Sequence, residues 1–214
     1  MRLTHFGHSC ILAELDGTRI LFDPGNFSHG FEGITGLDAI LITHQHPDHA
    51  DVQRLPALTD ANPGAALYAD PQTAAQLGGR WQAVHPGQRF TVGAVEASVG
   101  GGRHAVIHPD IPVIDNVAYL LGTESAPGQL LHPGDSLFVP WQPVDVLAIP
   151  AAAPWMKVSE AVDYLRAVCP RVAVPIHQGL LSDNGLGIYY GRLSEMSRDD
   201  TEFRTLSPED AVEV

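Results

Sequence analysis

The sequence predicts an α+β fold in which two sheets pack face to face and helices cover their outer sides. Three observations carry this prediction. Short apolar runs typical of strands outnumber helical patterns, helical patterns occur in both halves of the chain, and 21 glycines and 17 prolines suit many short elements joined by tight turns. No repeat, low-complexity run or linker divides the chain, so we expect residues 1–214 to form a single domain.

The amino-terminal half of the chain mixes short strands with two helices. Asp16-Gly17 between two apolar runs is a hairpin signal, and Pro71 is placed to open a helix, because proline is tolerated in a first turn. The expected strands are 1–6, 10–15, 19–22, 39–42, 66–69, 81–84, 89–92 and 95–99, and the expected helices are 50–58 and 71–77.

The carboxyl-terminal half has fewer helical patterns. One amphipathic helix is expected over 159–169, with Val162, Leu165 and Val168 on its apolar face and Pro170 as its stop. The expected strands are 116–121, 129–131, 145–149, 171–176, 202–206 and 211–214.

Composition argues against some classes of partner. The net charge of −13 disfavours binding to nucleic acid or to an anionic membrane. No apolar run approaches about 18 residues and no charged-then-apolar leader opens the chain, so we expect a cytoplasmic protein with no membrane partner. Cys10 and Cys169 are expected to be buried free thiols. The low charged fraction of the chain, 17%, and its apolar loops are compatible with a homo-oligomer.

The most specific stretch of the sequence is an apolar strand pattern that runs into a loop rich in histidine. His44 and His46 lie two positions apart, so they point the same way in an extended segment, and Asp48 and His49 follow a proline. Core packing gives no reason for three histidines and a carboxylate within six positions. Neutral imidazole and carboxylate are ligands that zinc and similar ions prefer, so this loop is predicted to bind metal.

Three further residues follow strand patterns or a glycine-rich turn: His104, Asp135 and His177. Loops at one edge of a sheet meet in space, so these side chains are expected to join the histidine loop. His108, four residues after His104, is the alternative at that position. Two divalent metal ions are expected, zinc first with manganese or iron as alternatives. The ligands are His44, His46 and His104 for one ion, Asp48, His49 and His177 for the other, and Asp135 as a bridge.

Four other residues are candidates for supporting roles. Asp23 follows a strand and is expected to orient a ligand or a loop from the outer shell, with a plain turn aspartate as the alternative. His8, His132 and Trp155 are candidates for lining the pocket. The alternatives are a histidine satisfied within a tight turn for His8 and a cap on the core for Trp155.

In this order and spacing, the residues resemble the metallo-β-lactamase superfamily. Its His-x-His-x-Asp-His loop matches residues 44–49, and Asp23, His104, Asp135 and His177 match its remaining motifs. The resemblance implies a four-layer αββα sandwich with the metals at one edge of the sheets. The segments 7–10 and 175–177 look most similar to a subgroup that includes ascorbate-6-phosphate lactonase and phospholipase-D-type acyl-ethanolamine hydrolases.

The expected function is that of a dinuclear metal-dependent hydrolase. A metal-bridging hydroxide would attack an ester-type bond of a small molecule, a phosphoester or a lactone, with Asp48 and Asp135 as the catalytic carboxylates and Asp48 moving the proton. The choice of bond rests on the resemblance to the subgroup. The alternatives are a catalytically silent metal-binding or sensory domain and a diiron redox protein, whose expected flavin module has no counterpart in the sequence.

Overall fold

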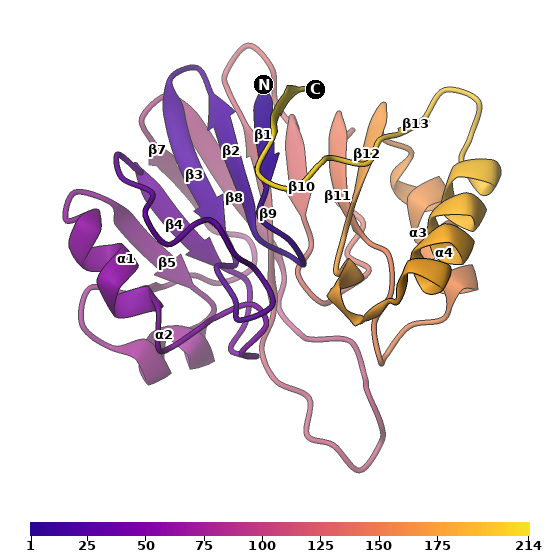
Figure 1. Cartoon of the computed structure of the whole chain (residues 1–214). Helices are drawn as coiled ribbons and strands as arrows, with labels where there is room; N and C mark the ends of the chain where they lie inside the picture. The colour runs from indigo at the N-terminus through magenta and orange to yellow at the C-terminus, as the bar shows by residue number, and fades with distance from the viewer.

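Two seven-stranded sheets lie against each other, and helices cover their outer sides (Figure 1). The computed structural model describes residues 1–214. The layers run helix, sheet, sheet, helix, so the predicted α+β sandwich is confirmed.

The first sheet has the strand order β14-β1-β2-β3-β4-β5-β6. Strands β14 to β3 pair antiparallel and β3 to β6 pair parallel. Because β14 pairs with β1, the two ends of the chain lie side by side (Figure 1). The strands are β1 Arg2–His5, β2 Ile11–Leu15, β3 Thr18–Phe22, β4 Ala39–Ile42, β5 Ala66–Ala69, β6 Gln82–Ala83 and β14 Ala211–Glu213.

The second sheet has the strand order β13-β12-β11-β10-β9-β8-β7. Strands β7 to β10 pair antiparallel, and β10 to β13 pair parallel. The strands are β7 Arg89–Val92, β8 Val95–Gly101, β9 Val117–Gly122, β10 Leu130–His132, β11 Val146–Pro150, β12 Val172–Ile176 and β13 Glu202–Phe203.

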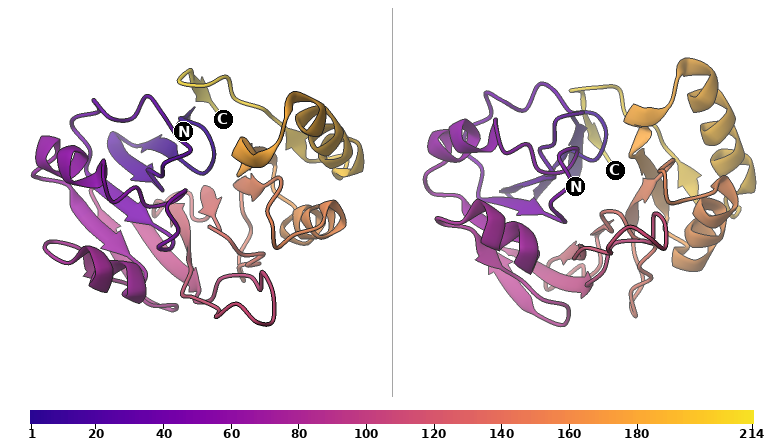
Figure 2. Two further views of the ribbon diagram at one scale, coloured as in Figure 1. Left: turned by 60° about the horizontal axis from the view of Figure 1, so that its bottom comes forward. Right: turned by 90° about the horizontal axis from the view of Figure 1, so that it is seen from below.

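Four α-helices form the outer layers, as the two views of Figure 2 show. Helices α1 and α2 pack on the first sheet, and α3 and α4 pack on the second. None of them has the length and apolar character needed to cross a membrane. The helices are α1 Leu55–Ala61, α2 Pro71–Leu77, α3 Val158–Val168 and α4 Asp183–Met196, and the short 3₁₀ turn η1 covers Gln178–Leu180.

The alternation of strand side chains divides the core into three parts. Leu41 of β4 faces the second sheet, and its neighbours Ile40 and Ile42 face the helices, because successive residues of a strand point to opposite faces. The same holds for Phe22 and Leu21 of β3. Both faces of these strands are buried, which explains why the sequence reads as continuous apolar runs.

Three details of the sequence prediction need correction. The helix expected at 50–58 begins only at Leu55, because the Asp51 carboxylate accepts the backbone N–H groups of Gln53 and Arg54 and holds a turn there. Helix α4 was not predicted, since only Leu193 of its residues is buried and its apolar periodicity is weak. Both cysteines are free, but Cys169, which directly follows α3, is half-buried and not buried as expected.

Candidate metal centre

The loops at one edge of the two sheets carry the candidate residues. Asp23 directly follows β3, the histidine loop 43–49 follows β4, Asp135 lies three residues after β10, and His177 follows β12. This edge lies at the bottom of Figure 1 and faces the viewer in the right-hand view of Figure 2. Residues far apart in the sequence therefore meet at one place.

One cluster consists of His44, His46, His104 and Asp135, whose ligand atoms lie within 4.8 Å of one another. His44 Nε2 lies 3.0 Å from His46 Nδ1, and His104 Nε2 lies 3.3 Å from Asp135 Oδ2. Three imidazoles and one carboxylate at this separation make a donor set that suits a divalent cation.

A second cluster consists of His8, Asp48, His49 and His177, again with ligand atoms within 4.8 Å of one another. Asp48 Oδ2 lies 3.0 Å from His8 Nε2 and 3.8 Å from His177 Nε2. His8 was expected only as a residue lining the pocket, and the structure brings it into this cluster.

Asp135 lies between the two clusters. Its Oδ1 is 3.1 Å from the Nε2 atoms of both His49 and His177, and its Oδ2 is 3.3 Å from His104 Nε2. Each oxygen of this one carboxylate therefore faces a different cluster. The Oδ2 atom also accepts a hydrogen bond of 2.8 Å from the indole N–H of Trp155.

The histidine rings are turned so that their free nitrogens face the centre. The Nδ1 atom of His104 donates to the carbonyl of Ala105, and that of His177 donates to the carbonyl of Ala152. The remaining Nε2 atoms of both histidines, and Asp135 Oδ1, are buried and make no hydrogen bond. Buried polar atoms without a partner cost free energy, and a bound cation would satisfy all three. The residues therefore fit divalent metal ions.

Asp23 contacts His49 and Thr43 on the side of the His49 ring that faces away from Asp135. Its Oδ2 atom lies 2.7 Å from His49 Nδ1 and accepts the Thr43 hydroxyl at 2.7 Å, while Oδ1 accepts the Thr43 backbone N–H. A carboxylate on Nδ1 leaves Nε2 of His49 free to face Asp135 and fixes the ring. These contacts are compatible with the outer-shell role that the sequence predicted for Asp23.

His8 acts on Asp48 as a hydrogen-bond donor. Its Nδ1 atom accepts the backbone N–H of Gly179 at 3.3 Å, so its proton sits on Nε2 and is donated to Asp48. Burial, the largest cause, lowers the pKa of His8 to about 4, so the ring is neutral at pH 7. Burial alone would raise the pKa of Asp48, but the bond from His8 and the proximity of His49 lower it to about 2. Asp48 is therefore ionised.

The backbone around the centre is held in unusual conformations. His8, Asp23 and His177 have φ values of +47°, +43° and +61°, a region that residues other than glycine seldom adopt. Such conformations persist only where the surrounding structure enforces them, and they concentrate at functional sites. At Gly25 a Cβ atom would lie 1.8 Å from the Asp48 carbonyl oxygen, so only glycine lets this turn pass the histidine loop.

Two supporting residues escaped the sequence analysis. Thr43 bonds to Asp23, as described, and Asn116 accepts the backbone N–H of Asp135 at 2.9 Å and donates to the Pro133 carbonyl. Thr43 directly precedes His44, and that position is the only signal the sequence offered. Asn116 had no signal, because it directly precedes β9 and resembles an ordinary strand-end residue.

The structure keeps two other histidines away from the clusters. His132 is fully buried, its Nε2 bonds to the Ser9 carbonyl, and its Nδ1 accepts the backbone N–H of Gly134. His108 lies in the segment between β8 and β9, which protrudes at the bottom of Figure 1, and 60% of its side chain is exposed. Of the pair His104 and His108, only His104 joins a cluster.

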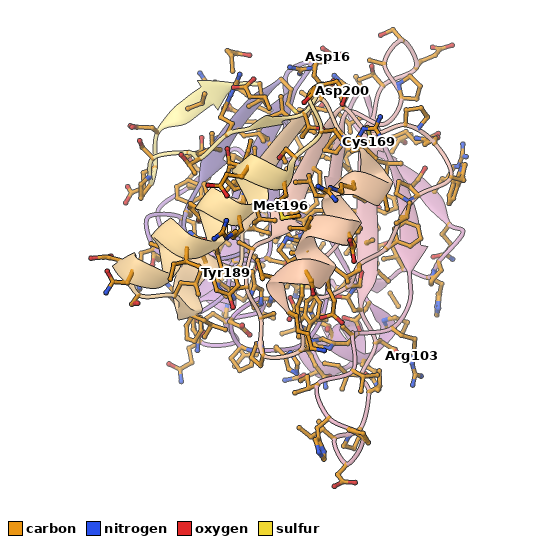
Figure 3. All side chains as sticks on the ribbon, turned by 90° about the vertical axis from the view of Figure 1, so that its right-hand side faces the viewer. Asp16, Arg103, Cys169, Tyr189, Met196 and Asp200 are labelled. Atoms are coloured by element: carbon orange, nitrogen blue, oxygen red, sulfur yellow. The ribbon has the colours of Figure 1, made fainter.

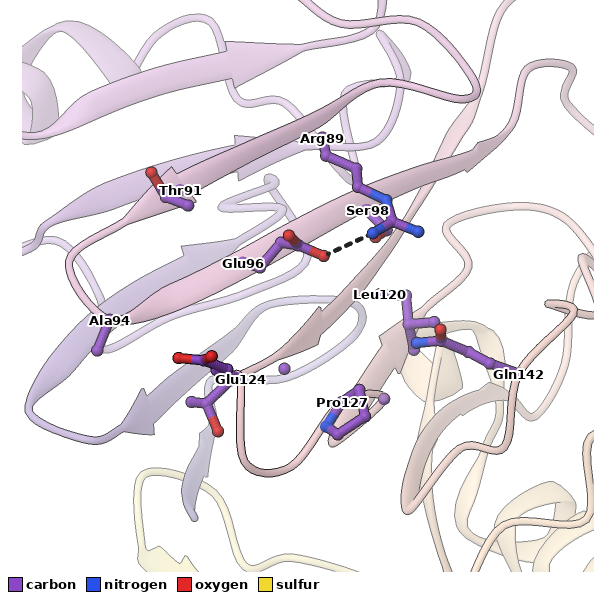
Figure 4. A pocket seen from close by; sticks show the side chains of 12 residues that line it. Arg89, Thr91, Ala94, Glu96, Ser98, Leu120, Glu124, Pro127 and Gln142 are labelled. Carbon is purple, nitrogen blue, oxygen red and sulfur yellow. Dashed lines mark hydrogen bonds and ion pairs between the residues drawn. The ribbon is translucent and has the colours of Figure 1, made fainter.

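Two of the hollows outside the clusters are of similar size and differ in their distance from the centre. The hollow in Figure 4, of about 450 Å³, lies on the outer face of β7–β9 and contains the ion pair of Arg89 and Glu96. It shares no residue with either cluster and has no histidine. The other hollow, of about 490 Å³, is lined in part by Trp155, whose indole N–H donates to the Asp135 carboxylate.

Comparison with known proteins places the chain among hydrolases. Residues 2–177 match the family model described as Beta-lactamase superfamily domain. Protein Rv0786c of Mycobacterium tuberculosis is 65% identical over 212 residues, covering 99% of both chains. A UPF0173 metal-dependent hydrolase of Opitutus terrae is 30% identical over 235 residues, covering 100% of both.

The arrangement of sheets and helices also recurs in solved structures. Igni18, a metallo hydrolase from the archaeon Ignicoccus hospitalis, superimposes with a TM-score of 0.73 at 20% identity, covering 99% of this chain and 97% of that one. At this identity the likeness concerns the fold alone.

Proposed function

Because the chain belongs to the metallo-β-lactamase superfamily, as a metal-dependent hydrolase of the UPF0173 family, we propose that its two clusters hold one divalent cation each and that it hydrolyses an ester-type bond of a small molecule. The observation that carries this proposal is Asp135, which turns one oxygen toward each cluster. The bond we propose is a phosphoester or a lactone.

The proposed ligands divide between two cations. His44, His46 and His104 hold one, and Asp48, His49 and His177 hold the other, with Asp135 between them. Two cations so placed supply Lewis acidity and a water of lowered pKa. The nitrogen and oxygen donors favour zinc, with manganese or iron as alternatives, since no cysteine joins either cluster.

We assign proton transfer to Asp48. Its side chain is 22% exposed, whereas that of Asp135 is 5% exposed, so Asp48 is the carboxylate of the centre that meets solvent and substrate. Against the effect of burial, the hydrogen bond from His8 and the proximity of His49 hold the pKa of Asp48 well below its ordinary value, so the carboxylate carries no proton of its own at neutral pH. His8, neutral and held by Gly179, keeps the Asp48 carboxylate in place.

A small substrate suits the charge of the molecule. The net charge of −13 opposes the approach of a polyanion, and local attraction at the centre would come from the cations themselves. The choice of a phosphoester or lactone rests on the resemblance of segments 7–10 and 175–177 to the lactonase and acyl-ethanolamine hydrolase subgroup.

The proposal is tested by elemental analysis of protein purified without added metal. We expect about two equivalents per chain and chelator-sensitive hydrolysis within a panel of phosphodiesters, lactones and thioesters. Asp48→Ala should fold, by circular dichroism, and lose turnover. The control is Asp110→Ala, which removes a carboxylate that is 90% exposed on the protruding loop and should keep wild-type activity. Absence of metal uptake, or full turnover by Asp48→Ala, contradicts the proposal.

A further inference from the structure

The hollow beside the centre has an apolar wall and a polar rim. Its apolar residues include Val106, Leu137, Phe138 and Trp155, and Arg103 lies at its rim. Its volume of about 490 Å³ lies within the range of pockets that bind small organic molecules.

Several residues that line this hollow are next to the candidate metal centre, either in the chain or through a hydrogen bond. Ala105 and Ser136, both in its lining, directly follow His104 and Asp135 in the chain. The indole of Trp155 donates to Asp135 Oδ2 and lies with its ring centroid 6.2 Å from that of His104. A molecule in the hollow therefore contacts the same indole that touches the carboxylate between the two clusters.

Arg103 differs from every other arginine of the chain. The other ten make hydrogen bonds or ion pairs with carboxylates or backbone carbonyls, whereas the Arg103 guanidinium makes neither. Figure 3 shows Arg103 below and beside helix α3. In a chain with 25 acidic and 12 basic residues, an arginine without an acidic partner in the lining of a pocket has its guanidinium N–H groups available to an external anion.

Glu160, the one acidic residue of the lining, is occupied elsewhere. Its Oε2 atom accepts the backbone N–H of Lys157 at 2.6 Å and so holds the first turn of α3. It makes no ion pair with Arg103, which leaves the guanidinium free to bind a ligand.

We propose that this hollow binds the part of the substrate that is not hydrolysed, namely an aryl or short alkyl group that ends in an anion. The apolar group lies against Trp155, Phe138 and Leu137, and Arg103 binds the terminal anion. The inference rests on the proposed hydrolase function, since it assumes that the reacting bond lies at the two clusters. It specifies the substrate as a small amphipathic acid derivative.

The test compares 4-phenylbutyrate with its uncharged analogue 4-phenylbutanamide on the zinc-loaded full chain. Binding is followed by the NMR signal of the Trp155 indole N–H, which is assigned from Trp155→Phe. We expect the acid to bind about tenfold more tightly than the amide, and Arg103→Gln to remove that preference without weakening the amide. The matched control is Arg89→Gln in the other hollow, which should behave as the wild type.

Two results overturn this inference. Equal binding of both probes, or no shift of the indole signal with either, excludes an anion-terminated apolar ligand in this hollow. A preference for the acid that survives Arg103→Gln places the anion at the metals instead. Repeating the titration with chelator separates the proposals, because loss of the metals removes the proposed hydrolase activity but leaves binding at Arg103 intact.

Discussion

At the scale of single residues, the partner of the Nδ1 atom determines the orientation and the protonated nitrogen of four histidine rings at the centre. The Nδ1 atoms of His49, His104 and His177 face Asp23 and two backbone carbonyls, so their Nε2 atoms are directed inward. His8 has the opposite arrangement, because a backbone N–H faces its Nδ1 and forces the proton onto Nε2. The Nε2 atom therefore offers a lone pair in His49, His104 and His177, whereas in His8 it donates a hydrogen bond.

His8 is expected to position Asp48 rather than bind metal. His8→Ala removes the donor to Asp48 Oδ2, and loss of an outer-shell hydrogen bond typically weakens metal affinity about 10- to 100-fold. His8→Gln places an amide N–H near the same point and should restore most of the affinity. Competition with a fluorescent chelator measures the effect.

A matched variant separates this role from general damage. His29→Ala removes a histidine that is 79% exposed and should leave metal affinity unchanged. If His8→Ala retained the affinity of the wild type while staying folded, Asp48 would be held without His8.

At the scale of elements, the first turn of α2 contains a buried carboxylate with no cationic partner. Asp70 accepts the backbone N–H groups of Gln72 and Thr73 and so caps the helix. Burial, opposed by these hydrogen bonds, raises the pKa of Asp70 to about 6. A carboxyl group with a raised folded-state pKa binds more protons in the folded protein, so its contribution to stability falls as the pH rises from about 4 to above 6.

Asp70→Asn is therefore expected to stabilise the protein in a pH-dependent way. Asparagine caps a helix as well as aspartate and carries no charge. The gain in the free energy of unfolding should be about 2–3 kcal/mol at pH 8 and less than about 1 kcal/mol at pH 4. Urea denaturation of both proteins at both pH values measures it, and a gain that does not depend on pH would contradict the assignment to Asp70 ionisation.

At the scale of the whole molecule, the proposed ligands link the two sheets. Asp48 and His49 follow a strand of the first sheet, while Asp135 and His177 follow strands of the second. Ions bound between them would hold the two sheets together at this edge, because a ligand that binds only the folded state stabilises it by mass action.

Removal of metal is therefore expected to lower the melting temperature. For an ion present at about 1,000 times its Kd the loss is about 4 kcal/mol, which corresponds to about 10 °C for a chain of this size. Calorimetry of the loaded protein with and without chelator gives the value. Asp135→Ala, which lacks the residue between the clusters, should show a smaller chelator effect, and an equal shift in both proteins would exclude a bridging role.

The sequence by itself determined the features that depend on the order of neighbouring residues, namely most strands and the histidine loop. The apolar run of β4 followed by residues 44–49 pointed to the candidate metal loop, because strand alternation and ligand chemistry are both evident from neighbouring positions. Most strands of both sheets followed from the same kind of pattern. Helix α4 did not, since its single buried residue leaves little periodic signal.

Only the tertiary structure decided which distant residues meet. It placed His104 in a cluster and His108 on an exposed loop, although the two lie four positions apart. It buried His132 with both nitrogens bonded and set His8 against Asp48 across 40 positions. The physical reason is that the direction of a side chain after a strand depends on loop conformation and on partners such as Gly179, which no spacing in the sequence encodes.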